Sequence, residues 1–363
     1  MIVFTSVTKS YIPKARVLAK SLKKYHPDWF FILLLSDTPP LHFDLSQEPF
    51  DELITIEQLP VENLKSWVFG LSIVELCTAV KGLAAVFIAK NYPCDKILYL
   101  DPDIKVFNSL QPIEEMLDRY DILLTPHMLD SESSYQAIID NEISVLKHGV
   151  YNLGFFAART DRQGLQFINW WSNRLYLFCH DDIPNGLFTD QRWCDLAPAF
   201  FSNLHIIRDI GYNVATWNIA HRNISIRPDK THYAGDNLLR FYHFTGYDHG
   251  GGKIMLQTYA ASNKDALTVW DEYGNDLVNE GHGSPEFNHW HYAHYENGET
   301  IPKQARIQYR SNTHLKVSYP DPFSVNSPSY KSHNEPQSTL VKLMAKTKFT
   351  RKIYGSIKKR IKK

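Results

Sequence analysis

The stretch of sequence that decides the fold is a short apolar run that stops at two carboxylates: Lys96-Ile97-Leu98-Tyr99-Leu100-Asp101-Pro102-Asp103-Ile104-Lys105-Val106-Phe107. Residues 97–100 read as a buried strand, so Asp101 and Asp103 follow at its carboxyl end. Open α/β sheets bind their ligands at this edge. Two carboxylates there, with only Lys105 as a basic neighbour, predict a divalent cation, Mn²⁺ or Mg²⁺, and a phosphate-bearing substrate. A plain Asp-Pro-Asp turn with capping carboxylates is the alternative.

Strand and helix patterns alternate on both sides of this stretch. Apolar runs predict further strands at residues 2–7, 30–35, 53–56, 121–125, 150–159, 204–207 and 239–245. Helical patterns occupy residues 15–22, residues 64–91 with a break near Gly82, and residues 166–178. The alternation predicts an α/β fold with a mostly parallel, twisted, Rossmann-like sheet and helices on both faces. From about residue 250 the pattern loosens, which predicts an irregular C-terminal extension.

The charge is distributed unevenly along the chain. The 363 residues have a formal net charge of zero, but residues 339–363 contain ten Lys and Arg and no acidic residue. The remaining residues, 1–338, therefore hold 29 basic and 39 acidic residues, a net charge of −10. This acidic body argues against a nucleic-acid partner.

The basic tail has a helical apolar pattern. Phe349, Ile353, Ile357 and Ile361 recur every four residues, and the basic residues lie mostly elsewhere around the helix. This pattern predicts a helix that lies on an anionic membrane surface. A disordered basic tail is the alternative, because short isolated helices are marginal in water.

The spacing of the cysteines and the pattern of the first residues indicate in which cellular compartment the protein is expected. The four cysteines have no Cys-x-x-Cys spacing, and the chain starts with a strand pattern rather than a signal peptide. The longest apolar stretches fall far short of the ~18 residues that a spanning helix needs. We therefore expect a reduced, cytoplasmic protein that associates peripherally with the inner face of the membrane.

Taken in order, six blocks of the sequence resemble GT-A fold glycosyltransferases. They are Phe4-Thr5-Ser6-Val7-Thr8, Tyr99-Leu100-Asp101-Pro102-Asp103, Tyr151-Asn152-Leu153-Gly154-Phe155, Asp190-Gln191, Tyr212-Asn213-Val214-Ala215-Thr216-Trp217-Asn218 and Tyr242-His243-Phe244-Thr245-Gly246. The resemblance is to the retaining enzymes of glycosyltransferase family 8 and to related bacterial surface-polysaccharide glycosyltransferases. It covers residues 1–248, about two thirds of the chain.

The resemblance implies roles for residues in five of these blocks. It implies that Asp101, Asp103 and His243 bind Mn²⁺ or Mg²⁺. The residues implied at the nucleotide and its diphosphate are Thr5, Ser6, Val7, Thr8, Lys81, Asp101, Asp103, Gly246 and Lys253. Those implied beside the donor sugar, as catalytic residues, are Asn152, Asp190 and Gln191.

The sequence departs from the family at one position. The lysine that normally follows three residues after the motif glycine is replaced by His249. We therefore expect the diphosphate to be neutralised by Lys81, Arg240 or Lys253.

Two groups of residues leave alternatives open. Asp190 also suits the cap of a helix, because Thr189-Asp190 precedes a helical stretch. The spacing of His289, His291 and His294, with His282 nearby, suits a second metal site. An aromatic surface loop and an acceptor-sugar platform explain those histidines equally well, since Trp290 and Tyr292 lie between them.

These observations predict a metal-dependent glycosyltransferase of bacterial surface polysaccharide synthesis. It moves a hexose, with retention, from a nucleotide-diphosphate donor such as a UDP-sugar to a glycan or lipid-linked acceptor. We expect a catalytic domain at residues 1–250, an aromatic and His-rich acceptor region at 251–335, and the tail at 336–363. The alternatives are a nucleotidyltransferase, although residues 5–10 lack the usual glycines, a non-catalytic glycan-binding protein, and a membrane scaffold led by the tail.

Overall fold

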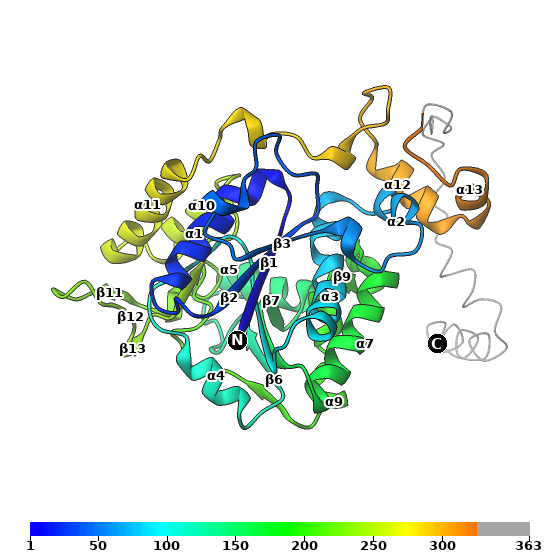
Figure 1. Cartoon of the computed structure of the whole chain (residues 1–363). Helices are drawn as coiled ribbons and strands as arrows, with labels where there is room; N and C mark the ends of the chain where they lie inside the picture. The colour runs from blue at the N-terminus through cyan, green and yellow to red at the C-terminus, as the bar shows by residue number, and fades with distance from the viewer. Residues whose placement is uncertain (325–363) are drawn as a thin grey trace, which may run out of the picture. The chain divides into compact units, whose positions relative to one another are not determined.

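The computed structural model describes residues 1–324, and all of these fall within one compact unit of the chain. Its centre is a seven-stranded sheet with the strand order β10-β6-β7-β4-β1-β2-β3 (Figure 1). The strands are β1 Ile2–Val7, β2 Phe30–Leu35, β3 Glu52–Thr55, β4 Lys96–Leu100, β6 Ile122–Pro126, β7 Tyr151–Arg159 and β10 Leu204–Ile206. The expected α/β class with a mostly parallel sheet is confirmed.

One strand of the sheet runs against its neighbours. The pairs β1–β2, β2–β3, β1–β4 and β10–β6 are parallel, whereas β7 is antiparallel to both β4 and β6. The start of β7 therefore lies at the same edge of the sheet as the end of β4. That edge carries Asp101.

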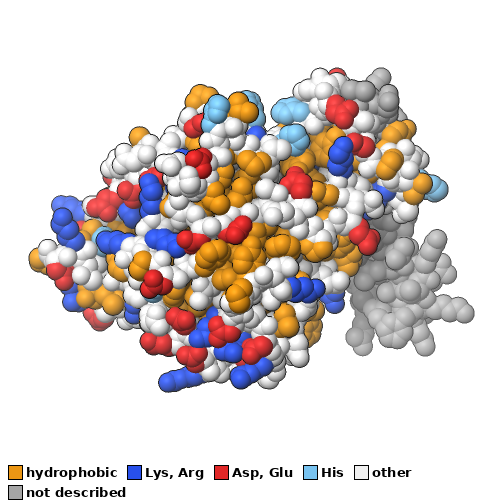
Figure 2. Space-filling model, in the orientation of Figure 1, with side chains coloured by type: hydrophobic (Ala, Val, Ile, Leu, Met, Phe, Trp, Pro, Cys, Tyr) orange, Lys and Arg blue, Asp and Glu red, His pale blue; other side chains and the backbone are white. Residues whose placement is uncertain are grey.

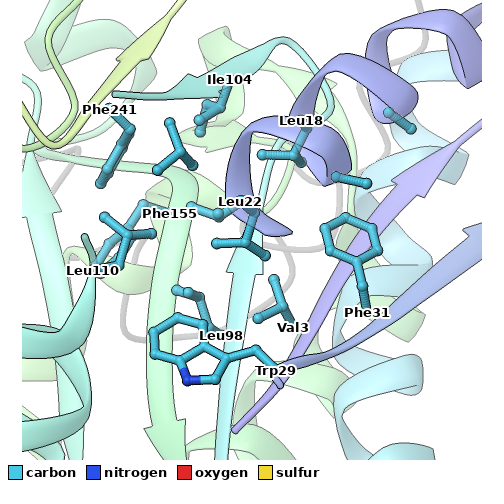
Figure 3. Packing of buried hydrophobic residues seen from close by; sticks show 14 of the residues in the cluster. Val3, Leu18, Leu22, Trp29, Phe31, Leu98, Ile104, Leu110, Phe155 and Phe241 are labelled. Carbon is cyan, nitrogen blue, oxygen red and sulfur yellow. The ribbon is translucent and has the colours of Figure 1, made fainter. Parts of the chain in front are cut away.

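Helices cover both faces of the sheet, as the strand patterns predict. The inner strands β1 and β4 are buried along their whole length and mostly apolar, which is typical of strands covered on both faces. On one face, α1 (Ile12–Lys23) buries Leu18 and Leu22 against Val3 and Leu98 (Figure 3). α4 (Gln111–Leu117) adds Ile113 and Leu117 to the same cluster. On the other face lie α3 (Ile73–Asn91) and α7 (Arg162–Phe178), where the ring of Trp171 packs 4.9 Å from that of Phe156.

The helical pattern at residues 64–91 is broken at a different place than expected. The break separates α2 (Leu64–Phe69) from α3, and Ser72 and Glu75 form a capping box at the start of α3. Gly82 lies inside α3, where an added Cβ would lie 2.6 Å from the Cα of Ser172 in α7. The glycine therefore serves close packing of two helices and does not end one.

Two short strands outside the main sheet complete its ligand edge. β5 (Ile104–Val106) follows the two aspartates and pairs antiparallel with β14 (Phe241–His243). The other small sheets are β8 Asp181–Asp182 with β9 Leu187–Phe188, and β11 Ile224–Ile226 with β12 His232–Ala234 and β13 Asn237–Leu238.

The chain after residue 250 is more regular than expected. It contains α10 Gly251–Tyr259, α11 Lys264–Asn279, α12 Lys303–Ser311 and α13 Thr313–Ser318. The loop between α11 and α12 binds the sheet edge after β2, where the backbone N–H of His291 donates to Oδ1 of the buried Asp37 over 2.9 Å. These helices belong to the same compact unit as the sheet.

The predicted basic tail, 336–363, and residues 325–335 lie outside the described residues. Within residues 1–324, no helix is both long and apolar enough to cross a bilayer.

Candidate active site

Two backbone pairings bring the expected metal ligands together. After β4 ends, the N–H of Asp101 donates to the carbonyl of Gly154 in β7 over 2.8 Å. After Asp103, the β5–β14 pairing sets His243 opposite Ile104, and the N–H of Phe244 donates to the carbonyl of Asp103 over 2.8 Å. The positions of all three side chains are therefore fixed by regular main-chain structure.

Asp101, Asp103 and His243 form a compact group of ligand atoms. Each offers one atom, and these atoms lie within 4.8 Å of one another. The Nε2 atom of His243 is 3.1 Å from Oδ1 of Asp103 and 3.8 Å from Oδ2 of Asp101. Two carboxylates and one imidazole are donors that can together hold a divalent cation.

The backbone leaves room for these ligands because residue 154 is a glycine. A Cβ at Gly154 would lie 2.5 Å from Cε1 of His243 and 2.9 Å from Oδ2 of Asp101. It would also lie 2.8 Å from Oδ1 of Asn152. Any side chain at Gly154 would thus displace the ligands, so the residues present fit a bound cation.

The opposite charges of the aspartates and His243 shift each other's pKa values. Burial would raise the pKa of Asp103, but the charge of His243 and its hydrogen bond, with a contribution from Lys14, lower it to about 2. Burial would lower the pKa of His243, but Asp103 and Asp101 outweigh it and raise the pKa. The raised pKa favours a protonated His243 beside the two carboxylates, and a bound cation would take the place of that proton, because metal-bound imidazole is neutral.

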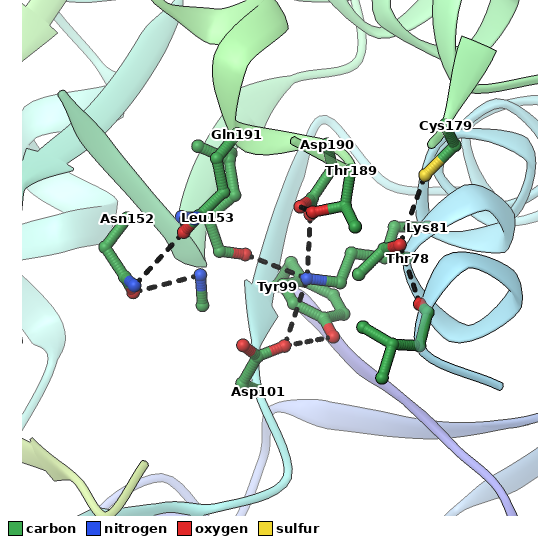
Figure 4. Close-up of polar contacts among 12 residues, drawn as sticks. Thr78, Lys81, Tyr99, Asp101, Asn152, Leu153, Cys179, Thr189, Asp190 and Gln191 are labelled. Atoms are coloured by element: carbon green, nitrogen blue, oxygen red, sulfur yellow. Dashed lines mark hydrogen bonds and ion pairs between the residues drawn. The ribbon is translucent and has the colours of Figure 1, made fainter. Parts of the chain in front are cut away.

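A buried lysine, Lys81, joins the Asp101 carboxylate to the Asp190 carboxylate (Figure 4). The Nζ atom of Lys81 lies 3.1 Å from Oδ1 of Asp101 and 2.9 Å from Oδ2 of Asp190. It also donates to the carbonyl of Leu153 over 3.1 Å. Burial would lower the pKa of Lys81, but Asp101 and Asp190 outweigh it and raise the pKa, so this lysine stays charged.

Asp190 is fully engaged by its neighbours. Its Oδ1 accepts a hydrogen bond from Oγ1 of Thr189 over 3.1 Å, and its Oδ2 pairs with Lys81. Burial raises the pKa of Asp190, and Lys81 offsets part of this rise. Thr189 has a φ of 42°, which is strained for a β-branched residue and indicates a constrained functional segment.

Asn152 and Gln191 belong to one hydrogen-bonded network. The Nδ2 of Asn152 donates to Oε1 of Gln191 over 3.2 Å and lies 3.1 Å from Nε2 of His127. The Oδ1 of Asn152 accepts from Gly154 N–H and from Nδ2 of Asn213, over 3.1 and 3.0 Å. The network fixes both amides, so they present defined donors and acceptors to a ligand.

Two clefts adjoin at the aspartates and Lys81. The first has a volume of about 390 Å³ and contains His243, Asn152, Asp190 and Gln191. The second, of about 240 Å³, contains Ser6, Val7, Thr8 and Tyr11. Val74, which is 58% exposed, borders both, and Figure 2 shows hydrophobic side chains gathered across the middle of the face in view. A larger cleft of about 770 Å³ between α1 and α11 contains none of the expected site residues.

Several expected residues lie outside both clefts. Thr5 is buried and its Oγ1 has no hydrogen-bond partner among the described residues. Gly246 has a φ of 71° and forms the turn before α10. Lys253 lies 3.7 Å from Asp271 in an exposed ion pair, and Arg240 donates to the carbonyl of Ser109 over 2.7 Å. Lys81 is thus the expected cation that the structure brings to the aspartates.

The sequence interpretation missed one buried cation near the site. Lys14 is 1% exposed, and its Nζ lies 2.7 Å from Oδ2 of Asp248 and 4.0 Å from the ring centre of Tyr11. The signal was present, because Lys14 lies on the same helical face as Leu18 and Leu22.

The interpretation also missed polar residues that support the site. His127 and Asn213 hold Asn152, and Tyr99 donates to Oδ1 of Asp101 over 2.6 Å. Asn213 has a φ of 51°, a conformation that asparagine tolerates better than most residues. The contacts of His127 and Asn213 with Asn152 join segments that are distant in the sequence, so spacing alone gave no sign of them, whereas Tyr99 lies two residues from Asp101.

The second histidine constellation does not form a metal group. Among residues 1–324, Asp101, Asp103 and His243 are the cluster of three ligands that the structure contains. His282 instead pairs with Asp248 over 3.3 Å.

No model of a protein family matches the chain. Two relatives come from Bacillus subtilis (strain 168). The uncharacterized protein YfnF is 26% identical over 276 residues, which cover 75% of this chain and 90% of YfnF. The uncharacterized protein YfnD is 22% identical over 250 residues, which cover 67% of this chain and 76% of YfnD.

The chain is also similar to solved structures of glycosyltransferases. The galactosyltransferase LgtC, in complex with donor and acceptor sugar analogs, is 16% identical with a TM-score of 0.45, covering 77% of this chain and 96% of LgtC. The glycosyltransferase GlyE of Streptococcus pneumoniae TIGR4 is 20% identical with a TM-score of 0.42, covering 76% of this chain and 63% of GlyE. Mouse xyloside xylosyltransferase 1 is 14% identical with a TM-score of 0.39, covering 68% of this chain and 97% of the mouse chain. Similarity at this level assigns no activity, so the function of this chain rests on its own site residues.

Proposed function

We propose that this protein is a metal-dependent glycosyltransferase of the GT-A type that uses a nucleotide-diphosphate sugar as donor. The observation that carries the proposal is the meeting of Asp101, Asp103 and His243 within 4.8 Å, beside a cleft that also contains Asp190 and Gln191. A cation-binding group next to hydrogen-bonding side chains suits a diphosphate joined to a sugar.

The reaction explains why these groups are needed together. A hydroxyl oxygen of the acceptor bonds to the anomeric carbon while the bond from that carbon to the phosphate oxygen breaks. The electron pair leaves with the diphosphate, and the hydroxyl proton ends on the nucleotide product. A divalent cation held by Asp101, Asp103 and His243 supplies Lewis-acid stabilisation of the negative charge on the diphosphate.

The residues of the chain itself orient the donor. Lys81 fixes the Asp101 carboxylate and the Asp190 carboxylate relative to each other. Asn152 and Gln191, held by their shared hydrogen bond, are suited to bind sugar hydroxyls. Ser6, Val7 and Thr8, together with Tyr11, border the second cleft, which suits the nucleoside.

The finer parts of the proposal follow the family resemblance. The donor is a UDP-hexose, the cation is Mn²⁺ or Mg²⁺, and the anomeric configuration is retained, as in family 8. The acceptor is a glycan or a lipid-linked glycan in bacterial surface polysaccharide synthesis. The protein acts in the cytoplasm at the inner face of the membrane, through the basic tail at residues 336–363.

Donor hydrolysis tests the proposal directly. The full-length protein is incubated with a panel of UDP-sugars, with Mn²⁺ or with EDTA, and the release of UDP is measured. We expect release from at least one donor that needs Mn²⁺ and is lost in His243→Ala, whereas His314→Ala, an exposed histidine in α13, keeps it. Release that is unaffected by both EDTA and His243→Ala would contradict the proposal.

The same assay separates the alternatives. A nucleotidyltransferase would release pyrophosphate from a nucleoside triphosphate and a sugar phosphate. A glycan-binding protein would bind ligand without releasing UDP from any donor.

A further inference from the structure

We infer that the wall of the 390 Å³ cleft formed by residues 141–148 and Phe188 is the acceptor subsite, and that it takes a pyranose ring whose hydroxyl binds His148. The inference rests on the proposed function and names the substrate class of the second half of the reaction. The same cleft contains the metal ligands and this wall, so a donor bound at the metal and an acceptor bound at the wall would be in contact.

The wall lies directly beside the residues assigned to the donor sugar. The Nε2 atom of Gln191 lies 3.4 Å from the carbonyl of His148. β9, which carries Phe188, leads through Thr189 into Asp190. An acceptor at this wall would therefore lie next to Asp190 and Gln191.

His148 offers a free hydrogen-bond acceptor to the cleft. Its Nδ1 lies 2.7 Å from the carbonyl of Ser144, which only accepts, so Nδ1 carries the hydrogen. The neutral ring then has its lone pair on Nε2. In the described part of the chain no group donates to Nε2, and the lone pair is suited to a hydroxyl of the ligand.

Phe188 gives this wall an aromatic surface. The ring of Phe188 is partly exposed and meets the ring of His148 edge to face, with 4.5 Å between the ring centres. A pyranose has an apolar C–H face and a rim of hydroxyls, so it suits an aromatic ring next to hydrogen-bonding groups. An alkyl chain suits this wall less well, because it would leave the hydrogen-bonding groups of the wall without partners.

Asn141 adds a second polar group with an unused acceptor. Its Nδ2 donates to Oε1 of Glu132 over 2.7 Å, which fixes the orientation of the amide because a carboxylate only accepts. Its Oδ1 has no partner within residues 1–324, although the side chain is only 1% exposed. A buried acceptor without a partner is costly, and a ligand hydroxyl would satisfy it.

The local backbone supports a functional role for this wall. Asn141 lies in a π-helical turn, Ile138–Glu142, between α5 (Tyr135–Ala137) and α6 (Ile143–His148). Such turns interrupt helices, frequently at functional sites. Here the turn sets Asn141, Ser144 and His148 on one cleft wall.

In the transfer step these residues position the acceptor. A pyranose hydroxyl other than the attacking one donates a hydrogen bond to Nε2 of His148, which orients the ring so that the attacking oxygen faces the anomeric carbon. Bond formation and cleavage then follow as in the proposed reaction, and the proton ends on the departing nucleotide. His148 and Phe188 are thus positioning residues.

Separate kinetics for donor and acceptor test the inference. The full chain is assayed with the UDP-sugar that it hydrolyses and a panel of methyl pyranosides, and the glycoside product is measured by mass spectrometry. In Phe188→Ala and His148→Ala we expect the KM for the pyranoside to rise roughly tenfold, and by a larger factor than the KM for the UDP-sugar. Phe200→Ala, an exposed aromatic residue in α9 (Ala197–Phe200) outside the cleft, and His314→Ala should change neither KM.

Two further readings keep the test decisive. Phe188→Tyr, which retains the ring, should keep the wild-type KM for the pyranoside even if Phe188→Ala folds poorly. If the wild type hydrolyses UDP-sugar but no pyranoside accepts the sugar, or if both KM values rise equally in Phe188→Tyr and His148→Ala, the inference is wrong and the proposed function stands. If the wild type releases no UDP, the proposed function itself fails.

Discussion

Nε2 of His243 lies 3.1 Å from Oδ1 of Asp103, although the two residues come from distant parts of the chain. The antiparallel pairing of β5 with β14 holds them there, since His243 is paired with Ile104. The ligand group is therefore built by main-chain hydrogen bonds, and a cation would bind without reorganising the fold.

The first prediction concerns the glycine beside the ligands. Gly154→Ala should abolish Mn²⁺ binding, because the added Cβ would lie 2.5 Å from Cε1 of His243. Overpacking should also lower the free energy of unfolding by about 1–3 kcal/mol. Loss of the free-Mn²⁺ electron paramagnetic resonance signal on titration with protein reports binding. Gly298→Ala is the control, because a Cβ added at Gly298 would meet no atom within 4 Å. Since Gly298 has a φ of 86°, this variant should lower the free energy of unfolding by about 1–2 kcal/mol and still bind Mn²⁺.

The second prediction concerns the buried lysine. Lys81→Met leaves the carboxylates of Asp101 and Asp190 without their cation, and should lower the free energy of unfolding by about 3–5 kcal/mol in urea denaturation. Adding Asp190→Asn should restore part of the loss, because the amide needs no cation.

A matched exposed lysine supplies the control for this prediction. Lys253→Met removes an ion pair whose side chains are 51% and 69% exposed, so its effect should stay below about 1 kcal/mol. Equal losses in Lys81→Met and Lys253→Met would refute the role of the buried pair.

The third prediction concerns pH and His127. Burial, with a smaller contribution from His243, lowers the pKa of His127 to about 4, whereas the unfolded residue titrates near 6.5. As the pH falls from 6.5 to 4, the unfolded chain binds a proton that the folded protein does not. The folded state is therefore destabilised, and His127 should lower the free energy of unfolding by about 2 kcal/mol between pH 7 and pH 5.

Urea denaturation at pH 7 and pH 5 checks this sign. His127→Gln keeps a polar partner for Asn152 and should lose less stability at pH 5 than the wild type does. The exposed His314→Gln should behave as the wild type. A His127→Gln variant with the full wild-type pH dependence would show that this residue is not the source.

The sequence was sufficient for the strands of the main sheet and for the expectation that Asp101, Asp103 and His243 lie together. The apolar runs at residues 2–7 and 30–35 match β1 and β2, because strands buried on both faces are mostly apolar. Asp101 and Asp103 were recognised because they follow such a strand. His243 was recognised through its motif, and its contact with Asp103 bears out the expectation that these residues lie together.

The sequence was insufficient where a contact depends on another segment. Gly82 was interpreted as a break in the helix, but the reason for a glycine there is its close contact with Ser172 in α7. The reversed direction of β7 leaves no local sign, yet it brings Asn152 to the metal edge. His127, Asn141 and His148 are ordinary polar residues in sequence, and their roles follow from partners that only the folded chain supplies.

A crystal structure of the protein soaked with UDP and Mn²⁺ tests the central claim most directly, since anomalous scattering identifies the manganese. We expect one strong anomalous peak bound by carboxylate oxygens of Asp101 and Asp103, by an imidazole nitrogen of His243 and by the diphosphate. A structure in which UDP is bound while the His243 imidazole points away from both aspartates, with no manganese between them, would contradict it.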